Sequence, residues 1–91
     1  MNNEKTMFEI YREGGYGRAY RVVYYSELTE HNRESQINRA MEGEQLFDGF
    51  LSNRTLPAAK QQIEALLSEL NDGASMDAPG IGDLLKDFLV S

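Results

Sequence analysis

Apolar and polar residues alternate in two stretches near the start of the chain. Met7 to Arg12 and Arg18 to Ser26 are rich in aromatic and β-branched side chains, and the five residues EGGYG between them supply the glycines that a tight loop needs. The sequence therefore predicts an N-terminal β-hairpin. The polar residues 1–6 ahead of it are expected to be disordered.

A register for this hairpin follows if Arg12 faces Arg18 across the loop. Because strand side chains alternate between two faces, five residues then share a face that suits a core: Phe8, Ile10, Tyr20, Val22 and Tyr24. The other face carries Glu9, Tyr11, Ala19, Arg21 and Tyr25. We expect this second face to be solvated and to hold a cross-strand pair between Glu9 and Arg21.

Residues 27–43 are mostly polar and fit two interpretations. Thr29 or Asn32 would cap a helix that ends at Gly43. The apolar residues at helical spacing in this helix are Ile37, Ala40 and Met41. Residues 37–41 also alternate, so a strand over residues 36–41 that turns at residues 42–44 is the competing interpretation. We favour the helix.

Two further elements follow. Gln45 to Leu51 is a short apolar run whose length and interior Gly49 favour a third strand with a bulge. A helix then begins near Thr55 and Pro57 and ends at residues 71–73. Its apolar stripe consists of Ala59, Ile63, Leu66, Leu67 and Leu70.

The last residues carry a second amphipathic pattern after a predicted loop over residues 74–82. It predicts a short final helix with a wide apolar stripe: Ile81, Leu84, Leu85, Phe88 and Leu89. This stripe either closes the core or docks into a partner, such as a second copy in a homodimer. We favour core closure, because a chain of 91 residues has few apolar side chains to spare.

The order of these elements predicts a single α+β domain over residues 1–91. We expect a three-stranded, mainly antiparallel sheet, made of the N-terminal hairpin and one later strand. Two to three helices would pack on one face of it. The length supports one hydrophobic core, and no linker divides the chain.

Charge and cysteine usage narrow the function classes. The net charge is −6, with residues 1–26 carrying a net +1 and residues 27–91 a net −7, which disfavours a generic nucleic-acid binder. The absence of cysteine excludes disulfides and thiolate metal sites and agrees with a reducing cytoplasm. No apolar run has the length of a signal peptide or membrane span, so we expect a cytoplasmic protein without a membrane partner.

No residue pattern points to catalysis. His31 is the sole histidine and lacks the nearby partners of a metal site or a triad. The glycine loop is followed by a strand rather than by the helix of a phosphate-binding loop. Because the carboxylates are scattered, we expect no enzyme activity, no metal site and no cofactor.

The hairpin holds the candidate interaction surface: Tyr11, Arg12, Tyr16, Arg18, Arg21 and Tyr25. Tyrosine and arginine are common at protein interfaces, and the same mixture stacks single-stranded nucleic acid. The structural alternative is that tyrosines simply favour strands and arginines solvate them.

Our leading hypothesis is a non-enzymatic protein-binding module, a small inhibitor or adaptor. A single-stranded nucleic-acid binder that uses the Tyr/Arg face of the hairpin is the first alternative, and a small enzyme, which would need a pocket that brings His31 together with two carboxylates, is the second. One version of the leading hypothesis is an acidic decoy for a basic nucleic-acid-handling protein, in the manner of a phage-type inhibitor. The carboxylates that would act in this way include Glu27, Glu30, Glu34, Glu42 and Glu44.

Overall fold

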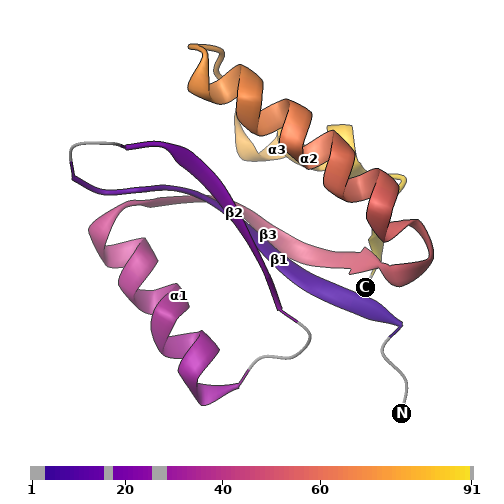
Figure 1. Cartoon of the computed structure of the whole chain (residues 1–91), viewed down its shortest axis with the longest axis horizontal. Helices are drawn as coiled ribbons and strands as arrows, with labels where there is room; N and C mark the ends of the chain where they lie inside the picture. Colours follow the sequence, from indigo (N-terminus) through magenta and orange to yellow (C-terminus); the bar gives the residue numbers. More distant parts are fainter. Residues whose placement is uncertain (1–3, 16–17, 26–28, 91) are drawn as a thin grey trace.

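The predicted α+β organisation is confirmed in the computed structural model, which describes residues 4–15, 18–25 and 29–90, apart from the side chains of residues 39 and 40. A short 3₁₀ turn, Asn53–Thr55, leads into the second helix. Within the described residues the elements follow the order β1 (Lys5–Arg12), β2 (Tyr20–Tyr25), α1 (Glu30–Glu42), β3 (Glu44–Ser52), α2 (Leu56–Asn71), α3 (Ala78–Leu85) and β4 (Leu89–Val90), as Figure 1 shows.

The four strands form one antiparallel sheet in the order β2-β1-β3-β4. Because β2 and β3 both run antiparallel to β1, they run parallel to each other, and the connection through α1 has to cross one face of β1. Figure 1 shows α1 on the opposite side of the sheet from α2 and α3. The expectation that all helices pack on one face is therefore wrong.

The hydrophobic core lies between the sheet and α2 with α3. Phe8 and Ile10 of β1 are fully buried, and Tyr20, Val22 and Tyr24 of β2 pack beside them, so the predicted core face is confirmed. Each fully buried Ile, Leu or Phe side chain contributes about 1.5–3 kcal/mol. The other buried members of this core are Leu51, Ala59, Ile63, Leu66, Leu70, Ile81 and Leu85.

The hairpin register differs from the predicted one by two residues. Arg12 pairs with Tyr20 instead of Arg18, and the Glu13 N–H donates to the Ala19 carbonyl at 2.9 Å. Arg18 takes a φ of 47°, a left-handed conformation that belongs to a turn rather than a strand. A shift of two residues keeps every side chain on its face and changes only its cross-strand partner.

The helical interpretation of residues 29–42 is confirmed, and the competing strand is wrong. The Thr29 hydroxyl accepts the Asn32 N–H at 3.1 Å, which caps the first turn of α1.

The predicted third strand is confirmed as β3. Its bulge lies at Leu46, because Ile10 pairs with Phe47 and Tyr11 with Gln45.

Gly49 is paired regularly instead of forming the predicted bulge. It lies opposite Phe8, and a Cβ there would stand 3.5 Å from the Phe8 ring. This is an ordinary van der Waals distance, so a methyl group at position 49 would pack against the ring without displacing it.

The end of the chain departs most from the prediction. α3 begins inside the predicted loop, because the Asp77 carboxylate accepts the Gly80 N–H at 2.9 Å and Pro79 sits in the first turn, where no N–H is needed. The helix stops at Leu85. The Ser52 N–H then donates to the Phe88 carbonyl at 3.0 Å, so residues 89–90 form a fourth strand on β3 instead of a last helical turn.

The start of the chain is also more ordered than predicted. Lys5 and Thr6 belong to β1, and the Thr6 hydroxyl donates to Asn53 Oδ1 at 2.6 Å. Residues 1–3 lie outside the described part. In the described part no helix has the length and apolar character needed to cross a membrane.

Two glycines allow the end of β1 to cross the turn between α1 and β3. A Cβ on Gly43 would overlap the carbonyl oxygen of Arg12, and a Cβ on Gly14 would overlap that of Glu42. Both obstacles are backbone atoms, which have no side-chain freedom to move aside. This crossing ties the C-terminal end of α1 to the hairpin.

Gly43→Ala is therefore expected to lower the free energy of unfolding by about 2 kcal/mol or more, as overpacking against backbone does. Gly49→Ala is the matched control, since its Cβ would meet only ordinary contacts. We expect the control to change stability by less than about 1 kcal/mol. Denaturant unfolding measures both, and equal losses for the two variants would contradict the crossing.

Candidate interaction surfaces

The six candidate residues of the hairpin do not gather on one exposed face. Tyr11 and Tyr25 lie on the α1 side of the sheet, whereas Arg12 lies on the α2 side. Arg18 is in the loop, and Tyr16 lies outside the described residues. Tyr25 is only 5% exposed, so its predicted place on the surface is wrong.

Two arginines of the hairpin, Arg12 and Arg21, make contacts within the chain. Arg12 Nε donates to the Arg18 carbonyl at 3.1 Å, and its guanidinium lies 5.1 Å from the centre of the Tyr20 ring. Arg21 Nε donates to Glu13 Oε2 at 2.8 Å, so the predicted pair of Arg21 with Glu9 is wrong. These contacts leave fewer free cations and aromatic faces for nucleic acid.

Glu9 is fully buried on the α1 side of the sheet, where a solvated face was predicted. Gln45 Nε2 donates to its Oε2 at 2.5 Å, and the Tyr25 hydroxyl lies at 3.5 Å from Oε1, the long limit for donation. A buried carboxylate is costly unless hydrogen bonds replace its water. An alternating pattern places every polar residue outward, so no local pattern in the sequence indicates this burial.

Replacing Glu9 by alanine is expected to destabilise the fold by about 1–3 kcal/mol, because the truncation leaves a cavity in place of a fully enclosed side chain and removes an acceptor of the Tyr25 hydroxyl and the Gln45 amide. Glu44→Ala removes an exposed carboxylate one residue from Gln45 and is the control. It should change stability by less than about 0.5 kcal/mol. Chemical denaturation of both variants measures the difference, and a Glu9→Ala protein as stable as the control would contradict the role given to this carboxylate.

Tyr24 is the other buried polar group of the hairpin, on the side of α2. Burial, with the charge of Glu64 as a smaller cause, raises the pKa of Tyr24 from 10.0 to about 12. Its hydroxyl has no hydrogen-bond partner among the described residues. Lys60 Nζ stands 4.8 Å from the centre of its ring.

A spectrophotometric titration should show a tyrosine component that ionises near pH 12, and Tyr24→Phe should reduce that component by one tyrosine. The unfolded chain loses this proton near pH 10, whereas the folded chain keeps it until about pH 12. Stability should therefore fall as pH rises through this window, and less steeply in Tyr24→Phe. Ionisation of all tyrosines near pH 10 in the folded protein would contradict this assignment.

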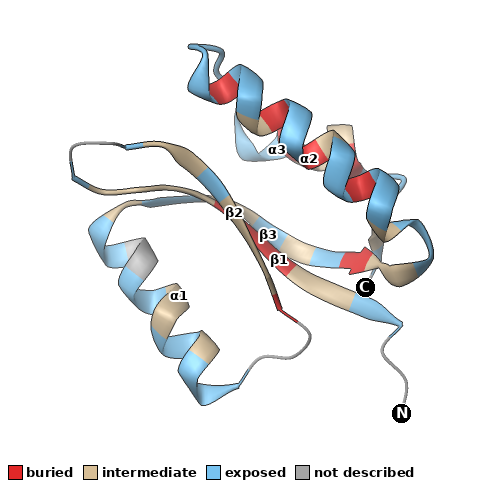
Figure 2. Cartoon of the chain, in the orientation of Figure 1, coloured by how far each residue is buried: buried red, intermediate tan, exposed pale blue. Residues whose placement is uncertain are grey.

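α1 presents its apolar side chains to water. Ile37 is 51% exposed and Met41 80% exposed, one helical turn apart, while Asn32, Ser35 and Gln36 on the other side are half-buried. Figure 2 shows a buried stripe along α2 and none in the described part of α1. The usual arrangement of an amphipathic helix is reversed here.

Exposed carboxylates flank this apolar pair. Glu30 and Glu34 lie on the same side of α1 as Ile37 and Met41 by helical spacing, and all four are exposed. We call these four residues the α1 outer face. Of the other carboxylates in the predicted decoy set, Glu42 and Glu44 are exposed nearby, and Glu27 lies outside the described residues.

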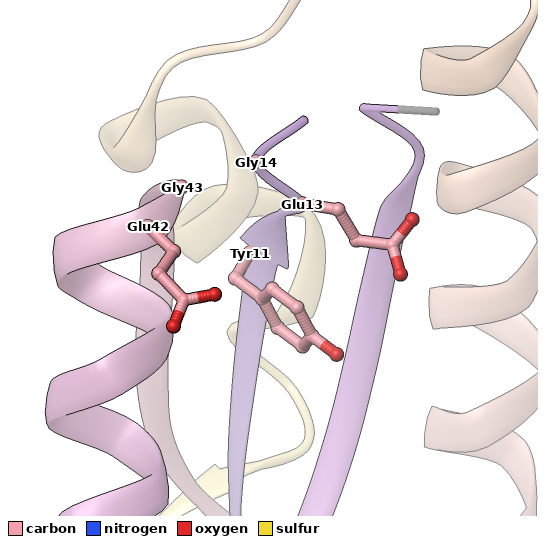
Figure 3. Close-up of a pocket in the computed structure, with 5 residues that line it drawn as sticks. All are labelled: Tyr11, Glu13, Gly14, Glu42 and Gly43. Atoms are coloured by element: carbon pink, nitrogen blue, oxygen red, sulfur yellow. The ribbon is translucent and has the colours of Figure 1, made fainter. Parts of the chain in front are cut away.

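A hollow of about 240 Å³ lies where the hairpin meets the end of α1, lined by Tyr11, Glu13, Gly14, Glu42 and Gly43. In Figure 3 the Glu42 carboxylate turns toward the Tyr11 ring, and the Glu13 side chain extends away from it. Glu13 is already paired with Arg21. No group of three His, Asp or Glu side chains in the described part of the chain has the geometry of a metal site, and His31 is exposed on α1.

Comparison with protein-family models, with curated proteins and with solved structures finds no match to this chain. Its function therefore has to be argued from its own surfaces.

The apolar stripe of the final amphipathic segment lies in the core, with Ile81 and Leu85 fully buried, so the core-closing interpretation is confirmed. The most unusual feature left on the surface is the α1 outer face.

Proposed function

We propose that this chain is a non-enzymatic protein-binding module that docks the α1 outer face into a groove of a partner protein. The observation that carries the proposal is the exposure of Ile37 and Met41 on a helix whose inner side is polar. Apolar side chains at i and i+4 are the anchors by which a helix enters a hydrophobic groove. Burying each of them would contribute about 1.5–3 kcal/mol to binding before the costs of association.

The orientation of α1 has a physical reason within the fold. The sheet face on its side contains the buried Glu9 carboxylate and its partner Gln45. Polar side chains on the inner side of α1 suit that face better than Ile37 or Met41 would. The apolar pair is therefore left on the outside, where only a partner can bury it.

Charge indicates the chemistry of the partner. Two carboxylates, Glu30 and Glu34, and one cation, Arg33, border the apolar pair, and the chain as a whole carries −6. A groove with a basic rim would be complementary, and this complementarity would speed association at low salt. A small inhibitor or adaptor that occupies the basic groove of a nucleic-acid-handling protein fits this description.

The test is affinity capture from lysate of the cells that express the protein, with matched variants of α1. Ile37→Glu combined with Met41→Glu should abolish recovery of a stoichiometric protein partner, because charge replaces both anchors. Asn38→Glu adds charge to an exposed position of the same helix and is the control. It should retain the partner, and recovery should fall as salt is raised.

Recovery of the same protein with the double variant would overturn the proposal, as would recovery of nucleic acid alone or of no partner. Thermal unfolding of each variant provides the check on folding. Because Ile37 and Met41 are exposed, the double variant should unfold within a few degrees of the unmodified chain.

A further inference from the structure

β2 forms an outer edge of the sheet, and one of its residues shows which backbone groups point outward. The Tyr20 N–H donates to Asn71 Oδ1 at 2.7 Å, and the Tyr20 carbonyl accepts from Asn71 Nδ2 at 3.2 Å. The Ala19 carbonyl, by contrast, accepts from Glu13 on the β1 side. Since these directions alternate along a strand, the N–H and C=O groups of Val22 and Tyr24 point away from β1.

The Asn71 side chain takes the place of a neighbouring strand at Tyr20 only. In the sheet that the described residues form, no strand pairs with the outer side of β2 beyond that point. Exposed edges of this kind accept an added strand through main-chain hydrogen bonds, which is the basis of β-augmentation.

The charges beside this edge differ in sign from the charge of the whole chain. β2 carries Arg21, whose side chain is 58% exposed, and no acid. Exposed Arg18 precedes the strand, and Lys60 of α2 stands over the Tyr24 ring. Glu13, which pairs with Arg21, and Glu64, whose charge acts on Tyr24, offset part of this positive charge.

We propose that the outer edge of β2 at Val22 and Tyr24 binds an extended acidic segment of a partner protein as an added antiparallel or parallel strand. Because alternate side chains of the added strand point to the same face, its carboxylates would lie on the α1 side of the sheet with Arg21, and its backbone would pair with β2. This surface is separate from the α1 outer face and carries the opposite charge. A chain with both surfaces would act as an adaptor between a basic and an acidic partner.

Two other occupants are less well matched to the edge. A second copy paired through β2 would bring the arginines of both copies together without adding an acid from either strand. Nucleic acid would need open aromatic faces, but Arg12 covers Tyr20, Lys60 covers Tyr24, and Tyr25 is buried.

The test uses the full chain and a synthetic peptide of roughly seven residues, the length of an ordinary strand, that alternates glutamate with valine. Binding is followed by NMR, together with hydrogen exchange of the backbone amides. The Val22 and Tyr24 amides should exchange about tenfold more slowly when the peptide is bound, because each gains an acceptor. The Val23 amide, which already faces β1, should change little.

Charge reversal supplies the matched variants. Arg21→Glu should raise the Kd for the peptide about tenfold, whereas Arg54→Glu, the same change at an exposed site outside the hairpin, should raise it less than about twofold. The same peptide with lysine in place of glutamate should not bind.

Several results would overturn the inference. They are the absence of binding at about 1 mM peptide, binding that leaves the Val22 and Tyr24 amides unprotected, and tighter binding of a single-stranded RNA oligomer than of the peptide. Protection of these amides by self-association alone would also overturn it. None of these outcomes involves α1, so the function proposed for the α1 outer face stands or fails separately.

Discussion

The rest of the structure depends on β1, a strand that is buried on both of its faces. On one side Phe8 and Ile10 enter the apolar core beneath α2 and α3, and on the other the Glu9 carboxylate is fully enclosed. One face therefore has to pack against apolar side chains, and the other against polar ones. The apolar face is covered by a conventional amphipathic helix, and the face with the carboxylate is covered by a helix whose inner side is polar.

This difference between the two faces explains why α1 turns its apolar residues to solvent. Its ends are held by the Thr29 cap and by the crossing of Gly14 with Gly43. Because these contacts and not a buried apolar stripe position the helix, Ile37 and Met41 are free for another purpose. The outer edge of β2 is also only partly used within the fold. The Asn71 side chain bonds the outward N–H and C=O of Tyr20, and no strand of the described sheet pairs with those of Val22 and Tyr24.

Alternation along the hairpin correctly predicted which side chains share a face, because that depends only on the two-residue period of a strand. It did not predict the register, since the centre of the turn depends on the positive φ of Arg18, a residue type that seldom adopts it. The helix of residues 56–71 followed from a stripe of five apolar residues. Its packing on the sheet agreed with that stripe.

Other features depend on contacts that no local pattern contains. The last strand consists of two residues whose pairing with β3 outweighs the helical spacing of Phe88 and Leu89. Glu9 looks like a solvated residue until Gln45 and Tyr25 are placed beside it. The sequence predicted an interaction surface of tyrosine and arginine on the hairpin. Ile37 and Met41 of α1 became candidates only from their exposure in the structure, because their helical spacing alone suggests a buried stripe.

α1 lies on the sheet with its polar side inward. Paramagnetic relaxation of methyl groups by a soluble, uncharged gadolinium chelate tests this orientation directly, because the effect depends on the distance from each methyl to solvent. We expect strong relaxation of the Ile37 and Met41 methyls and little for those of Ile10 and Ile63, which are fully buried. Ile37 and Met41 methyls as protected as those of Ile10 and Ile63 in the monomeric protein would contradict it.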